Sequence, residues 1–197
     1  MNTITKGSLH RKAEHGVDLA FVNRWSPRAM SGESIPESEL MVLFEAARWA
    51  PSAKNFQPWR MLYALRDSPH WPVFLGLLYE RNQIWAGRGA ALVLFISKMK
   101  HDDGTACPTH SFDTGAAWEN FALQATARHL VTHGMQGFDY PRARRELNIP
   151  DDFQVEAMAV VGKPGEKADL SEFNQTREFP NDRRPLSHTV REGRFTF

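Results

Sequence analysis

Residues 90–97, AALVLFIS, are apolar almost throughout and decide the class of fold. A run of this kind predicts a β-strand that is buried on both faces, because polar residues do not alternate with the apolar ones. Residues 155–162 (VEAMAVVG) predict a second buried strand, and residues 59–65 (WRMLYAL) predict a third. The chain is therefore expected to contain a β-sheet.

Helices are predicted between these strands. Residues 37–49 predict a helix with an acidic first turn, and Pro51 ends it. Residues 113–133 predict the longest helix, because apolar or small residues recur every three or four positions, and Gly134 and Gly137 then bracket a turn. Three shorter helices are predicted at residues 18–25, 72–79 and 139–147.

Strands and helices mix in this chain without a strict βαβ alternation, which favours an α+β layered fold over a Rossmann sheet. The length of 197 residues suits one domain. Residues 1–16 are polar and aperiodic and predict a loose N-terminal arm, so the domain is expected to span residues 17–197. Residues 164–197 are too polar for a core of their own and predict an extended tail that wraps the body or a partner chain.

Composition excludes several classes of protein. The chain has 24 Lys plus Arg and 23 Asp plus Glu, so it has no general positive field for nucleic acid. No window approaches the roughly 18 apolar residues of a membrane span, and the N-terminus lacks the apolar region of a secretory signal. The one cysteine, Cys107, cannot form an internal disulfide. We therefore expect a cytoplasmic protein that binds neither nucleic acid nor membrane.

Residues 24–28, RWSPR, suit a phosphate group. Arg24 and Arg28 lie on either side of a kinked turn that carries the hydroxyl group of Ser26. Guanidinium groups make bidentate, charge-assisted hydrogen bonds to phosphate, and the N–H groups of a turn add donors. Two surface arginines at a helix end would give the same pattern, and that alternative stays open.

Three further segments have the composition of ligand-binding loops. Residues 50–59 (APSAKNFQPW) present amide and hydroxyl groups in a loop stiffened by two prolines, which suits a planar heterocycle. Residues 134–139 (GMQGFD) have glycines that let backbone N–H groups approach a ligand, or that simply cap a helix. Residues 181–186 (NDRRPL) carry two arginines that close over an anion or form an exposed basic turn.

Taken together, these segments resemble the nitroreductase family of flavin mononucleotide (FMN) enzymes. They occur in the family's order and at its usual separations, and the resemblance covers about residues 17–194. The most specific element is the APSAKNFQPW stretch. The matching stretches are RWSPR at 24–28, APSAKNFQPW at 50–59, DTGAA at 113–117, GMQGF at 134–138 and RRPL at 183–186.

The resemblance implies a homodimer with a four- to five-stranded, mainly antiparallel sheet flanked by helices. Two FMN sites would lie at the dimer interface, each built from both chains. The long helix would pack against its symmetry mate, in agreement with its many alanines, and the C-terminal tail would wrap the partner subunit.

Carried over by position, the resemblance implies that Arg24, Ser26 and Arg28 hold the FMN phosphate and the flavin edge. Trp25 would contribute its backbone, and it is a departure, because the family often has a cation at that position. Arg183, with Arg184 as the alternative, would complete the phosphate clamp.

The remaining site residues would contact the ring and the ribityl chain. Asn82 would place an amide on the pyrimidine side, and Gln136 and Gly137 would offer backbone N–H groups near flavin N5 and O4. Four residues would come from the other chain: Pro51, Ser52, Ala53 and Asn55. Four aromatic residues are expected to shape the mouth of the pocket: Trp71, Phe74, Tyr79 and Trp85.

The chemistry implied by the resemblance is hydride transfer. NADPH or NADH would give a hydride to flavin N5 and leave, and a small electron-poor acceptor such as a nitroaromatic or quinone would take its place, in ping-pong order. The protein then needs no nucleophile, so no residue is assigned as catalytic beyond the N5 environment of Gln136 and Gly137.

Two other classes of function remain open. A protein that stores or senses FMN without turnover would have the same sequence features. A metalloenzyme would use the His, Asp and Cys residues of the polar loop 98–111, which include His101, Asp102, Cys107 and His110. His129 and His133 also have the i, i+4 spacing of metal ligands on a helix, but the glutamate of an H-E-x-x-H motif is missing, and no metal site is predicted.

Overall fold

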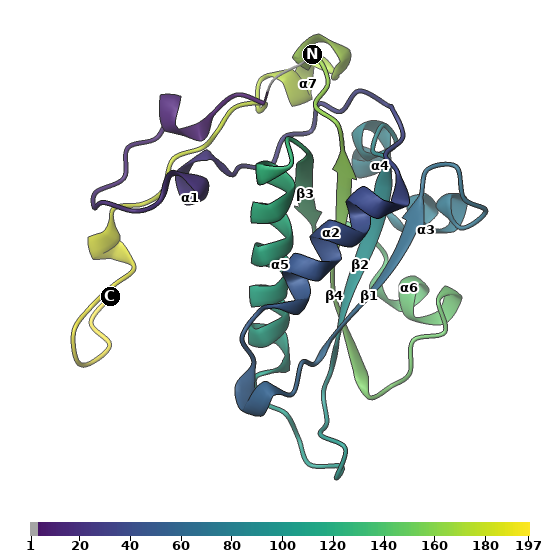
Figure 1. The fold of residues 1–197 in the computed structure, drawn as a ribbon, viewed down its shortest axis with the longest axis vertical. Coiled ribbons are helices and arrows are strands. Elements are labelled where there is room, and N and C mark those ends of the chain that lie inside the picture. Colours follow the sequence, from purple (N-terminus) through teal and green to yellow (C-terminus); the bar gives the residue numbers. More distant parts are fainter. Residues whose placement is uncertain (1–3) are drawn as a thin grey trace.

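The computed structural model describes residues 4–197, and its centre is a four-stranded antiparallel sheet in the order β1-β2-β4-β3 (Figure 1). The predicted α+β architecture is confirmed. The strands β2 and β4 lie inside the sheet, and β1 and β3 form its edges. The four strands are β1 (Trp59–Leu65), β2 (Ala91–Lys98), β3 (Val131–Met135) and β4 (Phe153–Gly162).

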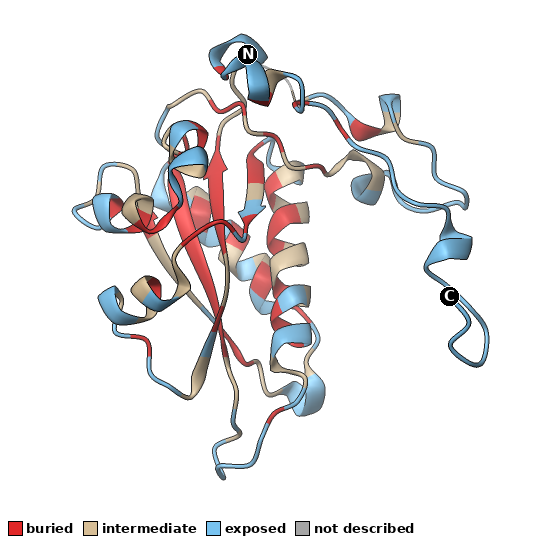
Figure 2. Ribbon diagram, turned by 180° about the vertical axis from the view of Figure 1, so that it is seen from behind, coloured by how far each residue is buried: buried red, intermediate tan, exposed pale blue. Residues whose placement is uncertain are grey.

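Helices cover both faces of the sheet, and this explains why residues 90–97 are apolar at nearly every position. On β2, Val93 and Phe95 pack towards helices α2 (Glu37–Arg48) and α5 (His110–Ala127). The alternate residues of β2 pack on the other face, in a cluster that includes residues of α3 (Trp71–Leu77), α4 (Glu80–Ala86) and α6 (Tyr140–Glu146). Figure 2 shows the resulting core as buried strands and inner helix faces.

Most predicted elements agree with the structure to within a few residues. The three predicted strands correspond to β1, β2 and β4, and the helix predicted at residues 37–49 is α2. The three short predicted helices correspond to α1 (Leu19–Asn23), α3 and α6. Helix α4 was not predicted, because only Trp85 and Ala86, at its C-terminal end, are buried.

The prediction of one helix over residues 113–133 is wrong at its C-terminal end. Helix α5 ends at Ala127, and His129 reverses the chain with a left-handed φ of 56°. The β-branched pair Val131 and Thr132 then starts β3, which pairs with β4 as the edge of the sheet. Gly134 consequently lies within this strand and not in a turn.

The N-terminal arm and the C-terminal tail leave the body side by side (Figure 1). Arg11 Nε donates to the carbonyl oxygen of Asn181 over 2.6 Å, and the N–H of Leu186 donates to Glu14 Oε1 over 3.1 Å. Several large apolar residues of the two segments and of the stretch from residue 17 through α1 are exposed to solvent: Leu9, Val17, Leu19, Phe21, Leu186, Val190, Phe195 and Phe197. Between residues 4 and 197, no helix is long and apolar enough to cross a membrane.

Candidate functional site

The segment predicted to bind phosphate follows α1 directly. Arg24 Nη1 donates to Ser26 Oγ over 3.4 Å, and its Nε lies 3.6 Å from Glu119 Oε1 on α5. The guanidinium group of Arg28 lies over the ring of Trp85, 5.8 Å from its centroid. Burial lowers the pKa of Arg28 below its usual value, although the carboxylate of Glu178 opposes this effect. Both arginine side chains are thus held by the body of the protein.

Trp25 has a different orientation from its neighbours. Its indole ring is buried, and Nε1 donates to the carbonyl oxygen of Thr5 over 2.9 Å. The side chain therefore anchors the N-terminal arm and does not join the pair of guanidinium groups, so only the backbone of Trp25 is available for the role predicted for it.

Glu178 of the tail fixes the end of the same segment. Its buried carboxylate accepts hydrogen bonds from the backbone N–H groups of Arg28 and Ala29, with distances of 2.9 and 3.0 Å to Arg28 N and 2.9 Å to Ala29 N. These two N–H groups are therefore not free for a ligand. The charge that this segment offers to an anion comes from the side chains of Arg24 and Arg28.

His133 joins this segment to the edge strand β3. Its Nδ1 lies 3.2 Å from the carbonyl oxygen of Pro27, and its ring lies 4.7 Å from the ring of Trp85. Burial, with a smaller contribution from the cations Arg28 and Arg24, lowers the pKa of His133 to about 4, although hydrogen bonds to backbone carbonyl groups oppose this effect. The imidazole is therefore neutral at pH 7, and because a carbonyl oxygen only accepts, Nδ1–H is the donor to Pro27.

Past the end of β3, Gly137 meets the amide of Asn82. Asn82 Nδ2 donates to the carbonyl oxygen of Gly137 over 3.0 Å, as does the backbone N–H of Tyr79. A Cβ atom on residue 137 would lie only 2.5 Å from Asn82 Nδ2, so this close approach requires glycine. The backbone N–H groups of Gln136 and Gly137 have no hydrogen-bond partner among the described residues. They remain available as donors to a ligand.

These contacts assemble two groups of predicted residues along one edge of the sheet. Arg24, Ser26 and Arg28 lie beside His133, and Asn82, Gln136 and Gly137 meet just past the end of the strand. His133 and Gln136 are three residues apart, and an extended chain rises by about 3.3 Å per residue, so about 10 Å of backbone separates these two residues.

The predicted loop at residues 50–59 lies elsewhere, at the N-terminal end of α5 (Figure 1). Asp113 Oδ2 accepts from the backbone N–H of Ala53 over 3.1 Å, and Ser52 Oγ accepts from the N–H of Gln57 over 3.0 Å. Three residues other than glycine in the loop have left-handed φ angles: Lys54 (53°), Asn55 (55°) and Gln57 (52°). The loop is thus fixed in shape, and Pro51, Ala53 and Asn55 are exposed. Within a single chain, the loop makes no hydrogen bond with Arg24 or Arg28 among the described residues.

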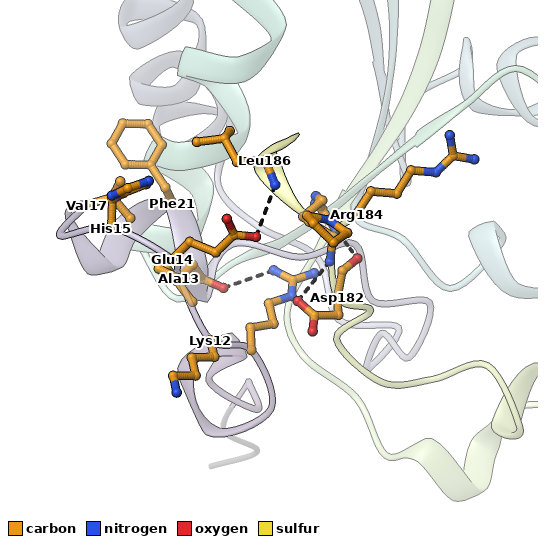
Figure 3. A pocket seen from close by; sticks show the side chains of 13 residues that line it. Lys12, Ala13, Glu14, His15, Val17, Phe21, Asp182, Arg184 and Leu186 are labelled. Carbon is orange, nitrogen blue, oxygen red and sulfur yellow. Dashed lines mark hydrogen bonds between the residues drawn. The ribbon is translucent and has the colours of Figure 1, made fainter. Parts of the chain in front are cut away.

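Arg183 and Arg184 lie on the tail, beside a hollow of about 500 Å³ between arm and tail, where Glu14 faces Leu186 (Figure 3). Arg183 Nη1 donates to the carbonyl oxygens of Asn181 and Asp182 over 3.3 and 3.2 Å. No hydrogen bond of either arginine reaches Arg24 or Arg28 within the described part of the chain.

Arg11 bridges these parts of the molecule. Its Nη1 donates to the carbonyl oxygens of Arg24 and Val22 over 2.7 and 2.9 Å, while its Nε binds the tail at Asn181. Burial lowers the pKa of Arg11, and the nearby cations Arg183 and Arg24 lower it further. Nothing in the polar sequence of the arm marks Arg11 for this position.

The residues considered as metal ligands are separated in space. His129 lies after α5 and His133 lies on β3, so the two do not share a helix face as predicted. In the loop after β2, Asp102 pairs with Lys98 over 2.6 Å, and His101 packs on Phe56. No group of three or more His, Cys, Asp or Glu residues within residues 4–197 could hold a metal ion.

The aromatic residues expected at the mouth of the pocket are mostly core residues. Trp71, Phe74 and Trp85 are buried among the apolar side chains of the sheet face that α3 and α4 cover. Only Tyr79 is exposed, so the prediction is wrong for the other three. Burial of these apolar rings in the core stabilises the fold more than their exposure at the surface would.

Comparisons with known proteins identify the relatives of this chain. The model of the nitroreductase family matches residues 22–70. A crystal structure described as an oxidoreductase containing FMN is 44% identical, covers 94% of this chain and 96% of its own, and superposes with a TM-score of 0.91. The NADH dehydrogenase of Thermus thermophilus is 25% identical over 87% of this chain and 93% of its own length. A putative nitroreductase from Desulfovibrio desulfuricans, solved in complex with FMN, is 24% identical, with a TM-score of 0.69 and coverage of 90% and 96%.

Proposed function

The chain belongs to the nitroreductase family, and we propose that it binds FMN and transfers reducing equivalents from NADH or NADPH to a small electron-poor acceptor, such as a nitroaromatic or a quinone. Membership of the family makes it an NAD(P)H-dependent flavin oxidoreductase. The observation that carries the FMN proposal is the pair of residue groups along β3: the arginine segment lies beside His133, and the unpartnered backbone N–H groups begin three residues further on, at Gln136.

The residues at this edge have the chemistry that FMN requires. Arg24 and Arg28 offer guanidinium groups to a phosphate dianion, and Ser26 adds a hydroxyl group. The free N–H groups of Gln136 and Gly137 would donate to the carbonyl and nitrogen acceptors of a flavin ring. Asn82 would reach the same ring from α4, since its amide already lies at Gly137.

Bound FMN would supply the atom that accepts and then gives up a hydride. The chain's part in the reaction is electrostatic. The backbone N–H groups of Gln136 and Gly137 would stabilise negative charge on a bound flavin ring, and no protein nucleophile would be needed. Because NAD(P)H and the acceptor would use one exposed ring face in turn, we propose a ping-pong order.

We propose that the working unit is a homodimer. The loop at residues 50–59 is rigid and exposed and lies at the N-terminal end of α5, and no hydrogen bond among the described residues joins it to Arg24 or Arg28. By this proposal a second chain supplies the loop to the site built on β3. The exposed apolar residues of the arm and tail also need a surface to cover them. By this proposal the tail wraps the partner subunit and carries Arg183 or Arg184 to the phosphate.

The proposal is tested by purification and anaerobic reduction. We expect a yellow protein, or a colourless one that gains flavin absorbance when FMN is added, and we expect NADH or NADPH to bleach that absorbance. Arg28→Ala should weaken FMN binding by roughly 10- to 100-fold, since hydrogen bonds to charged groups contribute about 1.5–3 kcal/mol. Arg145→Ala, which removes an exposed arginine on α6, is the matched control.

Each failure has a distinct meaning. A folded protein that takes up no FMN overturns the proposal. A protein that binds FMN but is not bleached by either nicotinamide cofactor is a storage or sensing protein without turnover.

A further inference from the structure

A second cavity of about 520 Å³ lies between α5 and the strands β3 and β4. It shares one residue, Gln136, with the proposed flavin site, so the two sites adjoin. Its remaining lining combines aromatic, apolar and polar side chains with two glycines: Phe95, Ser111, Thr114, Gly115, Trp118, Gly134, Met135, Glu156, Ala157 and Met158. Aromatic walls with a few polar groups are typical of a site for a small molecule.

Thr114 gives the first sign that the cavity is built for a ligand. The residue is only 2% exposed, yet its hydroxyl group has no hydrogen-bond partner. A buried hydroxyl without a partner destabilises the protein by about 1–3 kcal/mol. The hydroxyl oxygen has almost no accessible surface, so it would reach a polar atom of a ligand in the cavity by rotation of the Thr114 side chain.

Glu156 gives the second sign. In the pairing of β2 with β4, Phe95 lies opposite Ala157 and Ile96 lies opposite Val155, so Glu156 is the extra residue of a β-bulge. A bulge interrupts the alternation of side chains and re-aims the residue that it carries. Glu156 and Ala157 are consequently both part of the cavity wall, although they are neighbours on one strand.

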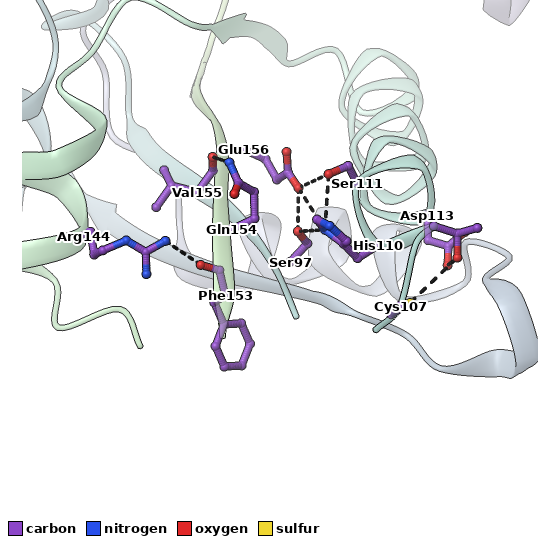
Figure 4. Close-up of polar contacts among 11 residues, drawn as sticks. Ser97, Cys107, His110, Ser111, Asp113, Arg144, Phe153, Gln154, Val155 and Glu156 are labelled. Atoms are coloured by element: carbon purple, nitrogen blue, oxygen red, sulfur yellow. Dashed lines mark hydrogen bonds and ion pairs between the residues drawn. The ribbon is translucent and has the colours of Figure 1, made fainter. Parts of the chain in front are cut away.

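The carboxylate of Glu156 is held in place by a hydrogen-bond network (Figure 4). Ser97 and Ser111 donate to Glu156 Oε1 over 2.5 and 2.6 Å. Since the hydroxyl hydrogen of Ser97 points at Glu156, the Nδ1 atom of His110, 2.8 Å from Ser97 Oγ, carries a ring hydrogen and donates it to that oxygen.

All of these contacts use Oε1. The second oxygen of Glu156 accepts no hydrogen bond within the part of the chain that the structure describes. It is left as an acceptor on a residue that lines the cavity together with Trp118, Phe95 and two methionines.

We propose that this cavity binds the electron acceptor of the enzyme, and that Glu156 selects aromatic acceptors that carry a hydrogen-bond donor or a positive charge. The inference rests on the proposed function. The ring packs between apolar walls beside Gln136, its donor reaches Glu156, and the Thr114 hydroxyl group rotates to meet a polar atom of the ligand. An acceptor with a carboxylate at the same position is rejected, because two carboxylates in a partly buried cavity repel each other.

The experiment compares three acceptors that share one nitrobenzene ring: 4-nitrobenzylamine, 4-nitrobenzyl alcohol and 4-nitrobenzoate. We expect the wild-type kcat/KM to fall in that order, with a ratio of roughly 10–100 between the amine and the benzoate, as for a hydrogen bond to a charged group. Glu156→Gln should bring the ratio below about 3, because the amide keeps the contacts with Ser97 and Ser111 but not the charge. Glu166→Gln, an exposed acid away from the cavity, should leave the ratio unchanged.

A binding measurement makes the test independent of turnover. Benzylamine and benzoate cannot be reduced, and calorimetry with FMN-loaded protein should show binding of benzylamine by the wild type and weaker binding by Glu156→Gln. A Cβ on Gly115 would meet no atom within 4 Å, so Gly115→Ala should be tolerated, whereas Gly115→Leu should project into the cavity and abolish binding of benzylamine.

The outcomes separate the two proposals. If the protein reduces all three nitro compounds with equal kcat/KM, and Gly115→Leu changes neither kcat/KM nor binding, the enzyme is as proposed and the cavity is not its acceptor site. If the protein takes up no FMN, the proposed function fails, and binding of benzylamine to the flavin-free protein then shows whether the cavity is a ligand site of another kind.

Discussion

Glu178 and Arg28 are 150 positions apart in the chain, and the carboxylate of the first accepts a hydrogen bond from the backbone N–H of the second over 2.9 Å. The same carboxylate also accepts from the N–H of Ala29. The tail therefore fixes the backbone on which the proposed phosphate-binding arginines stand, and the two ends of the domain meet at the functional site.

Loss of this contact should weaken both the fold and the site. Glu178→Ala would leave two N–H groups without an acceptor in a buried position, and we expect the free energy of unfolding to fall by about 2–3 kcal/mol. FMN affinity should fall as well, because Arg28 loses its fixed backbone. Urea denaturation and FMN titration check the two effects. Glu172→Ala, an exposed acid on α7 (Glu172–Gln175), is the control, and equal stability of the two variants would contradict the prediction.

His133 should make stability depend on pH. Its pKa is about 4 in the folded protein against 6.5 for an unperturbed histidine, so the unfolded chain binds more protons between these values. Stability from the neutral imidazole is therefore fully present above pH 6.5 and is lost as the pH falls towards 4. We expect the wild type to lose about 2 kcal/mol more than His133→Gln between pH 7 and pH 5.

Urea denaturation at the two pH values measures this difference. The control is His70→Gln, which removes an exposed histidine and should follow the wild type. Parallel pH profiles of the wild type and His133→Gln would show that the pKa of His133 is the same in the folded and unfolded states, and would contradict the prediction.

The sequence predicts the central strands well because burial on both faces leaves an unmistakable local pattern. β2 is buried at every position from Ala91 to Ser97, so its composition alone identifies it. β3 is different, because it is a short edge strand of five residues that contains His133 and Gly134. The helical periodicity of the preceding segment extends into it by chance, and only pairing with β4 determines that these residues form a strand.

The site could be predicted only as separate segments. The stretches at 24–28 and 134–138 were found from residue type, but the residue that joins them, His133, contacts Pro27 across 106 positions. Glu156 is similar, since its place in a β-bulge depends on its register with β2. Contacts of this kind are determined by tertiary structure and leave no periodic signal in the sequence.

Asp113 should control the shape of the loop at residues 50–59. Its buried carboxylate accepts from the N–H of Ala53 and from Thr109 Oγ1, each over 3.1 Å. Asp113→Ala removes both acceptors and should lower the free energy of unfolding by about 1–3 kcal/mol. Asp113→Asn keeps one acceptor oxygen and should recover part of this loss. Hydrogen exchange of the Ala53 amide reports the loop directly, and unchanged protection in Asp113→Ala would contradict the assignment.

Arg11 should hold the tail against the body. One guanidinium group donates to carbonyl oxygens of the tail and of the Arg24 segment at once, a geometry that the planar fork of arginine allows and the ammonium group of lysine does not. We expect Arg11→Lys and Arg11→Ala to release the tail to similar extents, seen as faster proteolysis between residues 176 and 197, while Lys12→Ala leaves the rate unchanged. FMN should dissociate faster from both Arg11 variants, because the carbonyl group of Arg24 loses its donor. If the tail of Arg11→Ala resists protease as well as that of the wild type, contacts other than those of Arg11 hold the tail. If Arg11→Ala retains FMN as the wild type does, the contacts of Arg11 do not contribute to phosphate binding.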